Sequence, residues 1–350
     1  MEFVRPLVLA IETSCDDTAC AVVDGDGRVL ASSVSSQLAA HRPYGGVVPE
    51  IASREHLANW PAVAETALAP LGLAPRDADL IAATRGPGLV GALLVGLSLG
   101  KALAYALGKP FFGVHHLEGH LWSPFLATGG EPAAPPASSF AALVVSGGHT
   151  ALYGVDGGAV TTLAETRDDA MGEVFDKLGK RLGLAYPQGP LVDKLAETGD
   201  AAAEPLPVPR VDGELFFSYS GLKSAAIRRL EQLERAGLTV DPADPPQAAR
   251  DLLAAFRTAA VAQLVDRVDR LHRERRFALL AVSGGVAANR LLRRDLTAWA
   301  EQRGVDLRLV PLAYAGDNAA MIAFAALQRH RRAEPGDPWS IEAESRIPLG

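Results

Sequence analysis

The two halves of this 350-residue chain open with the same pattern of predicted strands. In each half, three strand-like stretches follow one another, and a short loop of small or polar residues joins the first to the second. The predicted strands are 7–12, 19–24 and 28–34 in the first half, and 140–146, 150–155 and 159–164 in the second. A chain that starts twice in this way is predicted to build two related lobes rather than one large sheet.

Helix-like and strand-like stretches alternate after each opening. Apolar residues at helical spacing predict helices, and short apolar runs bounded by turns predict buried strands. The expected helices are 49–71, 91–107, 169–184, 219–236, 247–275, 291–302 and 317–330, and the further strands are 80–84, 111–114, 277–282 and 307–311. This duplication is that of the actin-like ATPase (ASKHA) fold, an α/β architecture in which two lobes enclose a nucleotide cleft.

A segment rich in proline, alanine and glycine separates the two halves. We therefore predict an N-terminal lobe over residues 1–122, a linker loop over 123–139 and a C-terminal lobe over 140–330. A helical insert is expected within the second lobe, over residues 190–275, and residues 331–350 are expected to form a C-terminal tail.

The composition excludes several classes of protein. With 48% hydrophobic and 21% charged residues, the chain is typical of a folded globular protein. A net charge of −7 gives no overall attraction to nucleic acid, so RNA binding would need a local basic surface or the surface of a partner. The N-terminus lacks a signal-peptide layout, and the longest apolar stretch, 86–100, is broken by glycines and too short to span a bilayer. A cytoplasmic protein without membrane contact is expected, and its two cysteines, Cys15 and Cys20, cannot form a Cys-based zinc site.

Two histidines stand four residues apart in the segment Gly113-Val-His-His-Leu-Glu-Gly-His120. On a helix, His116 and His120 would project from one face, one turn apart, where they could share a metal ion. Asp317, at the start of a predicted helix, is the best-placed third ligand, and it would complete a His, His and Asp set with a position open for substrate. The alternative is a solvated or hydrogen-bonded histidine pair that binds no metal.

The same pair does not fit a zinc peptidase. In the H-E-x-x-H motif the glutamate follows the first histidine directly, whereas here the acid is Glu118, two residues after His116. At about 100° per residue, Glu118 points away from the face that carries both histidines, so it cannot be the general base for a metal-bound water. Two imidazoles and a carboxylate suit Zn²⁺ or Fe²⁺ better than Mg²⁺, so one transition-metal ion per chain is expected to hold a substrate.

Two glycine pairs follow predicted strands in matching places of the sequence. In Ser146-Gly-Gly148 the glycines would let backbone amides approach a phosphate. The segment Ser283-Gly-Gly-Val-Ala-Ala-Asn289 opens a helix, where Gly284 and Gly285 could admit a flat ligand and Asn289 could hydrogen-bond it. Either pair alone is typical of a turn or a helix cap, but the matching places favour nucleotide binding.

Four aspartates accompany these motifs. The loop 13–18 carries Asp16 and Asp17, and an Asx turn would explain one of them but not the pair. Asp176 and Asp193 could accept hydrogen bonds from ribose hydroxyls, or they could be solvated helix residues with partners four positions away. The residues themselves leave these alternatives open.

Seven motifs together resemble the bacterial TsaD family. They occur in order between residues 7 and 330: Ile11–Thr18, His41–His56, Gly86–Gly91, His116–His120, Val145–Thr150, Phe217–Lys223 and Ser283–Asn289. The resemblance implies an enzyme that transfers the threonylcarbamoyl group from threonylcarbamoyl-AMP to the exocyclic amine of the adenosine next to the anticodon, in tRNAs reading codons that start with A, and releases AMP. The family was formerly described as a sialoglycoprotein endopeptidase, which the position of Glu118 opposes.

The resemblance also implies roles for individual residues. The metal ligands would be His116, His120 and Asp317. The adenylate contacts would be Val144, Val145, Ser146, Gly147, Gly148, Asp176, Gly189, Asp193 and Asn289, together with Gly284 and Gly285 of the second glycine motif. Asp16 or Asp17 could take up the proton released by the attacking amine, and water is the alternative. The family usually has glycine at Gln188, and Cys-Thr or a similar pair at Ala315-Gly316, so the shape of both loops is left open.

The resemblance further implies tRNA as a substrate and two protein partners, the smaller paralogue TsaB and the ATPase TsaE. The acidic balance of the chain suits a composite tRNA surface, to which Arg293 and Arg294 are expected to contribute. Two other functions compete with this one. A small-molecule kinase of the same fold would bind ATP and magnesium without needing a histidine pair. An ATP-gated chaperone would be expected to carry a substrate-binding domain after the ATPase, where little chain follows residue 330.

Overall fold

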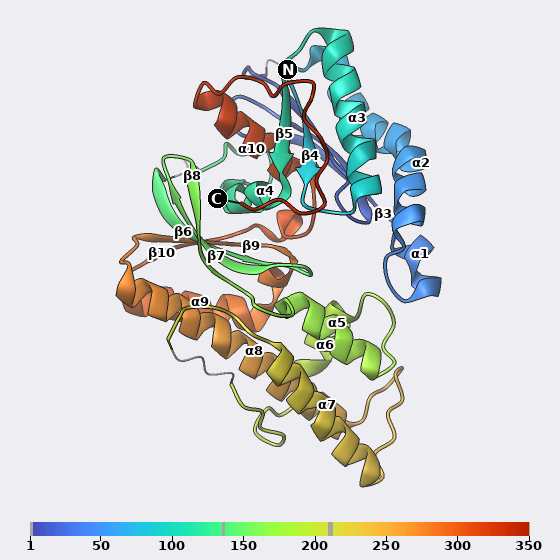
Figure 1. The fold of residues 1–350 in the computed structure, drawn as a ribbon, viewed down its shortest axis with the longest axis vertical. Coiled ribbons are helices and arrows are strands. Elements are labelled where there is room, and N and C mark those ends of the chain that lie inside the picture. The colour runs from blue at the N-terminus through green and yellow to red at the C-terminus, as the bar shows by residue number, and fades with distance from the viewer. Residues whose placement is uncertain (1–2, 135–136, 209–212, 350) are drawn as a thin grey trace. The chain divides into compact units, whose positions relative to one another are not determined.

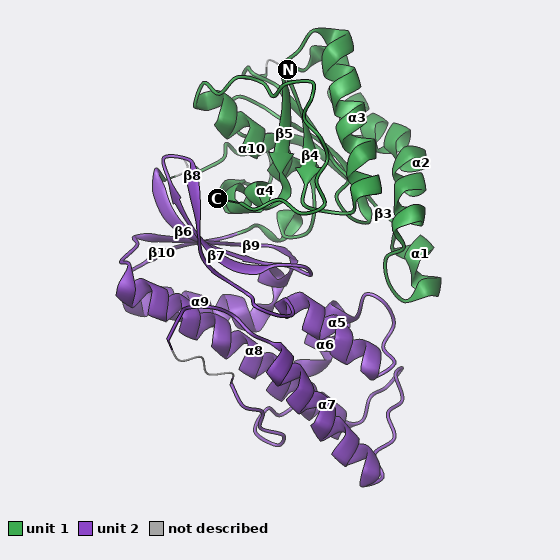
Figure 2. Cartoon of the chain, viewed as in Figure 1, with its two compact units in different colours: residues 1–137, 310–350 green, residues 138–309 purple. Residues whose placement is uncertain are grey.

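The computed structural model describes residues 3–134, 137–208 and 213–349. The chain divides into two compact units, which Figure 2 shows in different colours. Unit 1 comprises residues 1–137 and 310–350, and unit 2 comprises residues 138–309. Each unit contains one five-stranded sheet with helices packed on it, so the predicted α/β class is confirmed.

Unit 1 is built on a mixed sheet, of which Figure 1 labels β3, β4 and β5. The strand order of this sheet is β3-β2-β1-β4-β5. The first three strands pair antiparallel, whereas β4 and β5 run parallel to β1. The strands are Val8–Glu12 (β1), Asp17–Val23 (β2), Val29–Ser36 (β3), Leu80–Gly86 (β4) and Phe111–His115 (β5). Strands β1 and β5 are buried along their whole length, because helices cover both faces of the sheet.

The helices of unit 1 fix which way β1 points its side chains. They are Leu38–His41 (α1), Pro49–Leu68 (α2), Val90–Leu107 (α3), His116–Trp122 (α4) and Ala319–Arg331 (α10). Leu9 and Ile11 pack in an apolar cluster with residues of α2 and α3. Because strand residues alternate between faces, Glu12 points to the opposite side of the sheet, where α10 packs on β1 and against α4.

Unit 2 repeats the connectivity of unit 1. Its sheet has the order β10-β9-β6-β7-β8, with β6, β7 and β8 antiparallel in sequence and β9 and β10 parallel to β6. The strands are Ser139–Val145 (β6), Thr150–Asp156 (β7), Ala159–Glu165 (β8), Leu279–Ser283 (β9) and Asp306–Leu309 (β10). The prediction that both halves open with three consecutive strands is therefore confirmed.

The helices of unit 2 are Met171–Arg181 (α5), Gln188–Ala196 (α6), Ser220–Arg235 (α7), Gln247–Glu274 (α8) and Arg290–Arg303 (α9). Helix α8 is the longest, and it packs against α6, α7 and α9. Apolar or small side chains lie on most sides of α8, which is why it is buried by three neighbouring helices rather than lying on the surface.

The C-terminal part of the chain returns to unit 1, which differs from the predicted boundary at residue 330. Residues 310–330 were expected in the second lobe, but α10 packs on β1, β2 and α4, all of unit 1. Periodicity predicts that a helix has an apolar face, but not which sheet covers it. Beyond α10, Asp337 accepts a hydrogen bond from the Gly113 amide at 2.8 Å, and the Glu344 amide donates to the Arg85 carbonyl at 2.9 Å. The expected tail is therefore packed along β4 and β5.

Helix α3 contains most of the apolar stretch 86–100 and continues beyond it to Leu107. That stretch alone was predicted to be too short to span a bilayer. Over Val90–Leu107 the helix is long and apolar enough to cross a membrane by length and composition alone. It packs against β4 and α2, and a core helix of a globular protein meets the same two criteria. One such helix is weak support for a membrane span.

Candidate metal centre and glycine-lined pocket

The predicted histidine pair lies on a helix, as its spacing requires. Helix α4 starts at His116, directly after β5, and His115 caps it by accepting a hydrogen bond from the Leu117 amide at 3.1 Å through Nδ1. The rings of His116 and His120 are buried, and their centroids are 4.9 Å apart. The strand end and the helix cap together therefore hold both imidazoles in fixed positions.

Asp317 completes the predicted set of three ligands. Its Oδ1 lies 3.4 Å from His116 Nε2 and 3.3 Å from His120 Nε2. The ligand atoms of the three residues all lie within 4.8 Å of one another, which makes this group able to hold a metal ion. Asp317 lies just before α10 rather than inside it, since Asn318 is the N-cap residue.

The loop before Asp317 keeps its place despite the departure at Ala315-Gly316. The Asn318 side chain accepts a hydrogen bond from the Met321 amide at 3.0 Å and donates to the Tyr314 and Gly316 carbonyls at 3.1 and 2.8 Å. This single side chain ties the loop to the first turn of α10. The pair that is usual in the family is thus not needed to position the aspartate.

The donor set fits a transition-metal ion. Among the described residues, neither ring nitrogen of His120 has a well-directed hydrogen bond, although Nε2 lies near Asp317. A buried polar group normally has a partner, and a metal bound by Nε2 would supply one. Three ligands from two imidazoles and a carboxylate, with a position left over, are typical of zinc or iron sites that bind substrate.

Glu12 supports His116 from the side opposite Asp317. Its Oε2 lies 3.3 Å from His116 Nδ1, and the Ser14 hydroxyl lies 3.2 Å from the same nitrogen. Glu12 is held by the Ser14 amide, which donates to Oε1 at 2.5 Å, and by the Thr84 hydroxyl, which donates to Oε2. A carboxylate behind a histidine fixes its tautomer and orients the other nitrogen toward a metal.

Sequence reasoning missed Glu12, which pairs with a residue 104 positions away. The signal in the sequence was a glutamate at the end of an otherwise apolar strand, VLAIE. In the structure this carboxylate is fully buried, on the opposite face of the strand from Leu9 and Ile11. A charged group at such a position needs a partner, because burying an unpaired charge is costly.

The four titratable side chains of the centre, His116, His120, Asp317 and Glu12, form one electrostatic unit. Burial disfavours a charge on His116, but Asp317 and Glu12 outweigh it and hold the pKa of His116 well above its usual range. Burial likewise opposes ionisation of Asp317, yet His116 holds the pKa of that carboxyl well below its usual range. Burial lowers the pKa of His120. The centre therefore favours one positive charge between two carboxylates, which a bound cation would supply in place of the proton.

Glu118 faces away from the centre, as its position in the helix predicted. Its Oε1 lies 3.8 Å from an Arg332 guanidinium nitrogen. Burial raises the pKa of Glu118 to about 6, despite the opposing effect of Arg329 and Arg332. The peptidase arrangement is thus excluded by geometry as well as by spacing.

The loop that carries Asp16 and Asp17 adjoins the metal centre. The Ser14 hydroxyl contacts His116, and the Ser14 carbonyl accepts from the Leu89 amide at 2.8 Å. Burial raises the pKa of Asp17 to about 7; the Asp16, Asp317 and Glu12 carboxylates add to the rise, and a hydrogen bond with Ser36 opposes it. Asp17 can therefore exchange a proton near neutral pH.

The glycine motifs of unit 2 meet at one pocket of about 340 Å³. Its lining contains six of the predicted adenylate contacts: Gly147, Asp176, Gly189, Asp193, Gly285 and Asn289. Gly172, Phe175, Pro187, Pro190, Val286 and Ala288 complete that lining. Residues separated by more than a hundred positions in the sequence are thus brought together.

The remaining predicted contacts do not belong to the described lining of this pocket. Val144 and Val145 are buried in β6, and the Ser146 hydroxyl accepts a hydrogen bond from the His149 amide at 3.2 Å. Gly284 has a φ of +91°, and an added Cβ would lie 2.2 Å from the Val145 carbonyl oxygen. That glycine is required by the close approach of two backbones.

Gly147 and Gly285 differ from Gly284 in this respect. A Cβ built at either position meets no atom within 4 Å in the described structure. The protein itself therefore does not require glycine at these two positions. The absence of a side chain leaves the backbone amides open to a ligand.

The predicted polar contacts of the pocket hold one another. Asp193 Oδ1 accepts from the Asn289 amide nitrogen at 2.5 Å and from Arg257 at 3.2 Å. Asn289 also caps α9 by accepting from the Leu292 amide at 2.9 Å, and Asp176 Oδ1 accepts from the Gly189 amide at 2.6 Å. The alternative of solvated residues with partners four positions away therefore does not describe either aspartate.

Gln188, where the family usually has glycine, is the first residue of α6 and is buried. Its side chain packs against Gly179 of α5, where an added Cβ would lie 2.6 Å from Gln188 Cβ. The larger residue is thus accommodated by a glycine on the facing helix and leaves Gly189 in the pocket lining.

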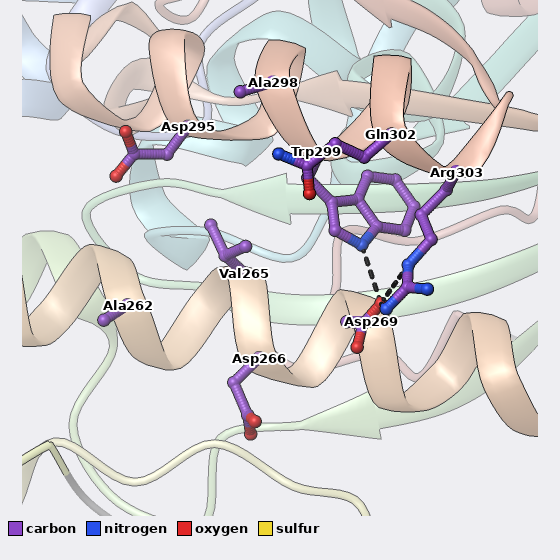
Figure 3. Close-up of a pocket in the computed structure, with 9 residues that line it drawn as sticks. All are labelled: Ala262, Val265, Asp266, Asp269, Asp295, Ala298, Trp299, Gln302 and Arg303. Atoms are coloured by element: carbon purple, nitrogen blue, oxygen red, sulfur yellow. Dashed lines mark hydrogen bonds and ion pairs between the residues drawn. The ribbon is translucent and has the colours of Figure 1, made fainter.

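Another hollow, of about 540 Å³, lies between α8 and α9 and contains no predicted site residue (Figure 3). Its most buried acid, Asp269, accepts hydrogen bonds from Trp299 at 2.9 Å and Arg303 at 2.8 Å. Arg273 donates to the same carboxylate at 2.8 Å. An acid so fully paired has little capacity left for a ligand.

Comparison with known proteins decides the family of this chain. The sequence model of TsaD, described as tRNA N6-adenosine threonylcarbamoyltransferase, matches residues 28–324. The chain belongs to the TsaD family. It is thus a transferase, and the TsaD resemblance seen in its motifs is confirmed.

Relatives named tRNA N6-adenosine threonylcarbamoyltransferase are similar to this TsaD-family chain over nearly their whole length. The protein of Sorangium cellulosum is 47% identical and covers 98% of this chain and 96% of its own. The protein of Pelobacter propionicus is 51% identical, over 91% of this chain and 90% of its own. A Thermus thermophilus relative is 47% identical over 98% of both.

Solved structures establish the fold of this TsaD-family chain. HypF of T. kodakarensis superposes with a TM-score of 0.59 at 16% identity, over 95% of this chain and 49% of HypF. Component A of the Acidaminococcus fermentans (R)-2-hydroxyglutaryl-CoA dehydratase gives 0.50 at 16% identity, over 94% and 99% of the two chains. At such identities the likeness concerns the fold alone, and it confirms the actin-like ATPase class.

Proposed function

We propose that this TsaD-family chain transfers the threonylcarbamoyl group from threonylcarbamoyl-AMP to the exocyclic amine of the adenosine next to the anticodon, in tRNAs reading codons that start with A. Family membership supports the tRNA threonylcarbamoyltransferase activity. The observation that carries the finer proposal is the coexistence of two preformed sites, the His, His and Asp group and the glycine-lined pocket. The first site could hold a metal ion that binds an oxygen of the acyl group, and the second site suits an adenylate.

His116, His120 and Asp317 would hold one Zn²⁺ or Fe²⁺ ion, which when bound would polarise an oxygen of the acyl donor as a Lewis acid. Glu12 and Ser14 fix the ring of His116 so that Nε2 faces Asp317. Both imidazoles are buried, whereas the Asp317 side chain is partly exposed.

The pocket of unit 2 would bind the AMP part. The backbone amides at Gly147 and Gly285 would meet the phosphate, because no side chain covers them. Asp176 and Asp193 each use Oδ1 within the protein, and their Oδ2 atoms would accept from the ribose hydroxyls. Pro187, Pro190 and Val286 give the apolar walls that suit a flat base.

In the transfer step, the tRNA amine nitrogen attacks the carbamoyl carbon. A nitrogen–carbon bond forms, the bond from that carbon to the phosphate oxygen breaks, and AMP departs with the bonding electrons. The proton lost by the amine passes to a base. Asp17, whose pKa burial raises to about 7, is the base we propose, with Asp16 or water as the alternatives.

The same proposal includes tRNA, TsaB and TsaE as partners in the cytoplasm. Unit 1 offers a surface for a protein partner, because Val90, Leu94 and Tyr105 of α3 and Leu57 of α2 are exposed. We propose that the TsaB paralogue covers this helical face, since an exposed apolar surface of this kind is typical of an interface. The net charge of −7 suits tRNA binding shared with partners.

Incubation of the metal-loaded chain and its partners with threonylcarbamoyl-AMP and unmodified tRNA tests the function. Modified tRNA and AMP should appear in equal amounts, and neither should form with His116→Ala. A kinase would instead consume ATP to phosphorylate a small molecule, with no dependence on the histidines. Absence of modified tRNA under conditions where the complex binds both substrates would contradict the proposal.

A further inference from the structure

Three buried polar side chains of unit 1, outside both sites, are linked to one another by hydrogen bonds. They are Gln37, His41 and His56, with 2%, 0% and 0% of their surface exposed. His41 and His56 stand at the two ends of a motif, 41–56, to which the proposed function gives no role. Buried polar side chains normally have hydrogen-bond partners, so each donor and acceptor of these three side chains should have one.

The three side chains form an unbroken chain of hydrogen bonds. The Val48 amide donates to His41 Nδ1 at 3.2 Å, and His41 Nε2 lies 3.1 Å from Gln37 Oε1. Gln37 Nε2 lies 3.1 Å from His56 Nδ1, and His56 Nε2 lies 3.1 Å from the Cys15 carbonyl oxygen. We refer to Gln37, His41 and His56 as the relay.

The partners of the relay determine its proton positions. Cys15 offers a carbonyl, so His56 Nε2 must carry the proton, and Nδ1 then accepts from the Gln37 amide and from the Thr18 hydroxyl at 2.7 Å. His41 Nδ1 accepts from a backbone amide, so its Nε2 donates to Gln37 Oε1. With both rings neutral and the Gln37 amide in this orientation, every donor of the relay meets an acceptor.

The relay ends on the loop that carries the two candidate acids. His56 binds the Cys15 carbonyl, and the Gln37 backbone amide donates to the Asp16 carbonyl at 2.9 Å. The relay residues therefore hold the backbone carbonyl groups of both Cys15 and Asp16. On its other side the loop is held at Ser14, by His116 and the Leu89 amide.

This loop needs such a restraint for electrostatic reasons. Burial is the main cause that raises the pKa of Asp17, and the Asp16, Asp317 and Glu12 carboxylates add to the rise, so charge repulsion also acts on this loop. Without a fixed backbone, the repulsion would move the loop away from the metal centre. Neutral groups bonded to its carbonyls hold the loop without adding charge to the centre.

We propose that Gln37, His41 and His56 are positioning residues, which hold the Cys15–Asp17 backbone and thereby place the Asp16 and Asp17 carboxylates for the transfer step. The proposal rests on the proposed function, in which one of these acids accepts the proton. The three residues touch neither the reacting atoms nor the metal ligands.

Gln37→Glu is the sharpest test, because it changes one donor into an acceptor at nearly constant shape. The new carboxylate still accepts from His41, but it faces the lone pair of His56 Nδ1 and the Ala52 carbonyl, to which the Gln37 amide donates at 3.3 Å. One added proton, on the new carboxylate or on His56, would restore a donor there. The titratable groups that act on the pKa of His56 are Glu12, Asp16 and His41.

We expect kcat of Gln37→Glu to fall about tenfold at pH 8, the cost of one unmade buried hydrogen bond, and to recover toward the wild-type value at pH 6. KM for threonylcarbamoyl-AMP and the metal content should stay unchanged. Gln263→Glu is the matched control, because Gln263 is a buried glutamine of unit 2 that bridges the Ser218 amide and carbonyl at 3.0 and 2.9 Å. The kcat of Gln263→Glu, relative to that of wild type, should not rise as the pH falls.

Nitrogen-15 NMR of the imidazoles reads the relay without any activity. Wild-type His41 and His56 should both be in the tautomer with the proton on Nε2 that their hydrogen bonds require, and burial, which lowers the pKa of His56, favours the neutral form of that ring. A different tautomer in either ring would overturn the relay. Correct tautomers with an unchanged pH profile of kcat in Gln37→Glu would overturn the positioning role while leaving the proposed function intact. A wild-type complex that transfers nothing would overturn both.

Discussion

The first hairpin of unit 1 and the first hairpin of unit 2 occupy the same place in the same topology, yet they carry opposite chemistry. Between β1 and β2 the chain reads Thr13-Ser-Cys-Asp16, and Asp17 begins the second strand. Between β6 and β7 it reads Ser146-Gly-Gly-His149. One hairpin brings carboxylates next to a centre that favours a cation, and the other removes side chains where an anion would sit. A duplicated fold thus offers two equivalent loops that can be specialised for opposite charges.

The two hairpins also differ in how they are supported. The acid-bearing loop is held by buried polar side chains: Glu12 accepts a hydrogen bond from the Ser14 amide, and His56 contacts the Cys15 carbonyl. The glycine loop adjoins α5, where an added Cβ on Gly172 would lie 2.6 Å from the Ser146 carbonyl oxygen. The first loop therefore depends on buried polar contacts, and the second depends on close backbone packing.

The largest effect is expected from the double substitution His116→Ala and His120→Ala. Metal content should fall from one ion per chain to nearly none, and transfer should fall by about a thousandfold, since a Lewis acid contributes several kcal/mol. Elemental analysis of protein purified without chelator measures the first, and Glu118→Gln should behave as wild type. A full complement of metal in the double variant would show that unit 1 does not hold the cation.

Glu12→Gln should weaken metal affinity by about 10- to 100-fold without abolishing binding, because the carboxylate orients His116 but is not itself a ligand. Chelator competition measures the affinity. Glu118→Gln is again the matched control, because Glu118 is a partly buried carboxylate on α4 that faces Arg332 rather than His116. Equal affinities in the two variants would mean that the support behind His116 has no influence on the metal.

In the glycine-bearing hairpin, Gly147→Val should weaken AMP binding by about tenfold or more, because a side chain would replace at least one amide contact to phosphate. Its melting temperature should match that of wild type, since nothing lies within 4 Å of an added Cβ. Gly284→Ala should do the reverse and destabilise the fold by roughly 1–3 kcal/mol. Calorimetric titration and thermal unfolding separate the two, and identical behaviour would refute the distinction between an open and a packed glycine.

The acid-bearing hairpin should leave a mark on stability against pH. Burial raises the pKa of Asp17 to about 7 from its ordinary value of 3.8, so the folded chain holds a proton between these values that the unfolded chain has released. Stability from this group is therefore present at low pH, is lost as the pH rises through that window, and changes no further above it. In metal-free protein, Asp17→Asn should gain in urea midpoint relative to wild type from pH 4 to pH 8. A constant difference would show that Asp17 ionises freely.

The smallest effect concerns tRNA. Arg290 and Arg294 have exposed side chains, whereas Arg293 donates to the Ala287 carbonyl at 3.1 Å and supports the turn before α9. The structure therefore favours charge reversal at Arg290 and Arg294 over the pair first expected from the sequence. Each lost phosphate contact should reduce the slope of log affinity against log salt by about one unit in the assembled complex. An unchanged slope would place the tRNA surface elsewhere.

What the sequence predicted correctly depends on local pattern. Strand alternation and turn residues indicated both sets of three strands, and a four-residue spacing placed His116 and His120 on one helical face. What it missed depends on contacts between distant segments. Glu12 meets His116 across 104 positions, Asn289 meets Asp193 across 96, and α10 returns to the first sheet. No periodicity within one segment specifies which other segment will cover it.

His115 links helix α4 to the segment that follows α10. One ring nitrogen accepts a hydrogen bond from the Leu117 amide at 3.1 Å and so caps the ligand helix, and the other lies 3.1 Å from the carbonyl oxygen of Ile347. A deletion or fusion that displaces Ile347 would therefore disturb the contact that anchors α4. Metal content and activity are better measured on protein in which the segment around Ile347 is intact, which mass spectrometry verifies.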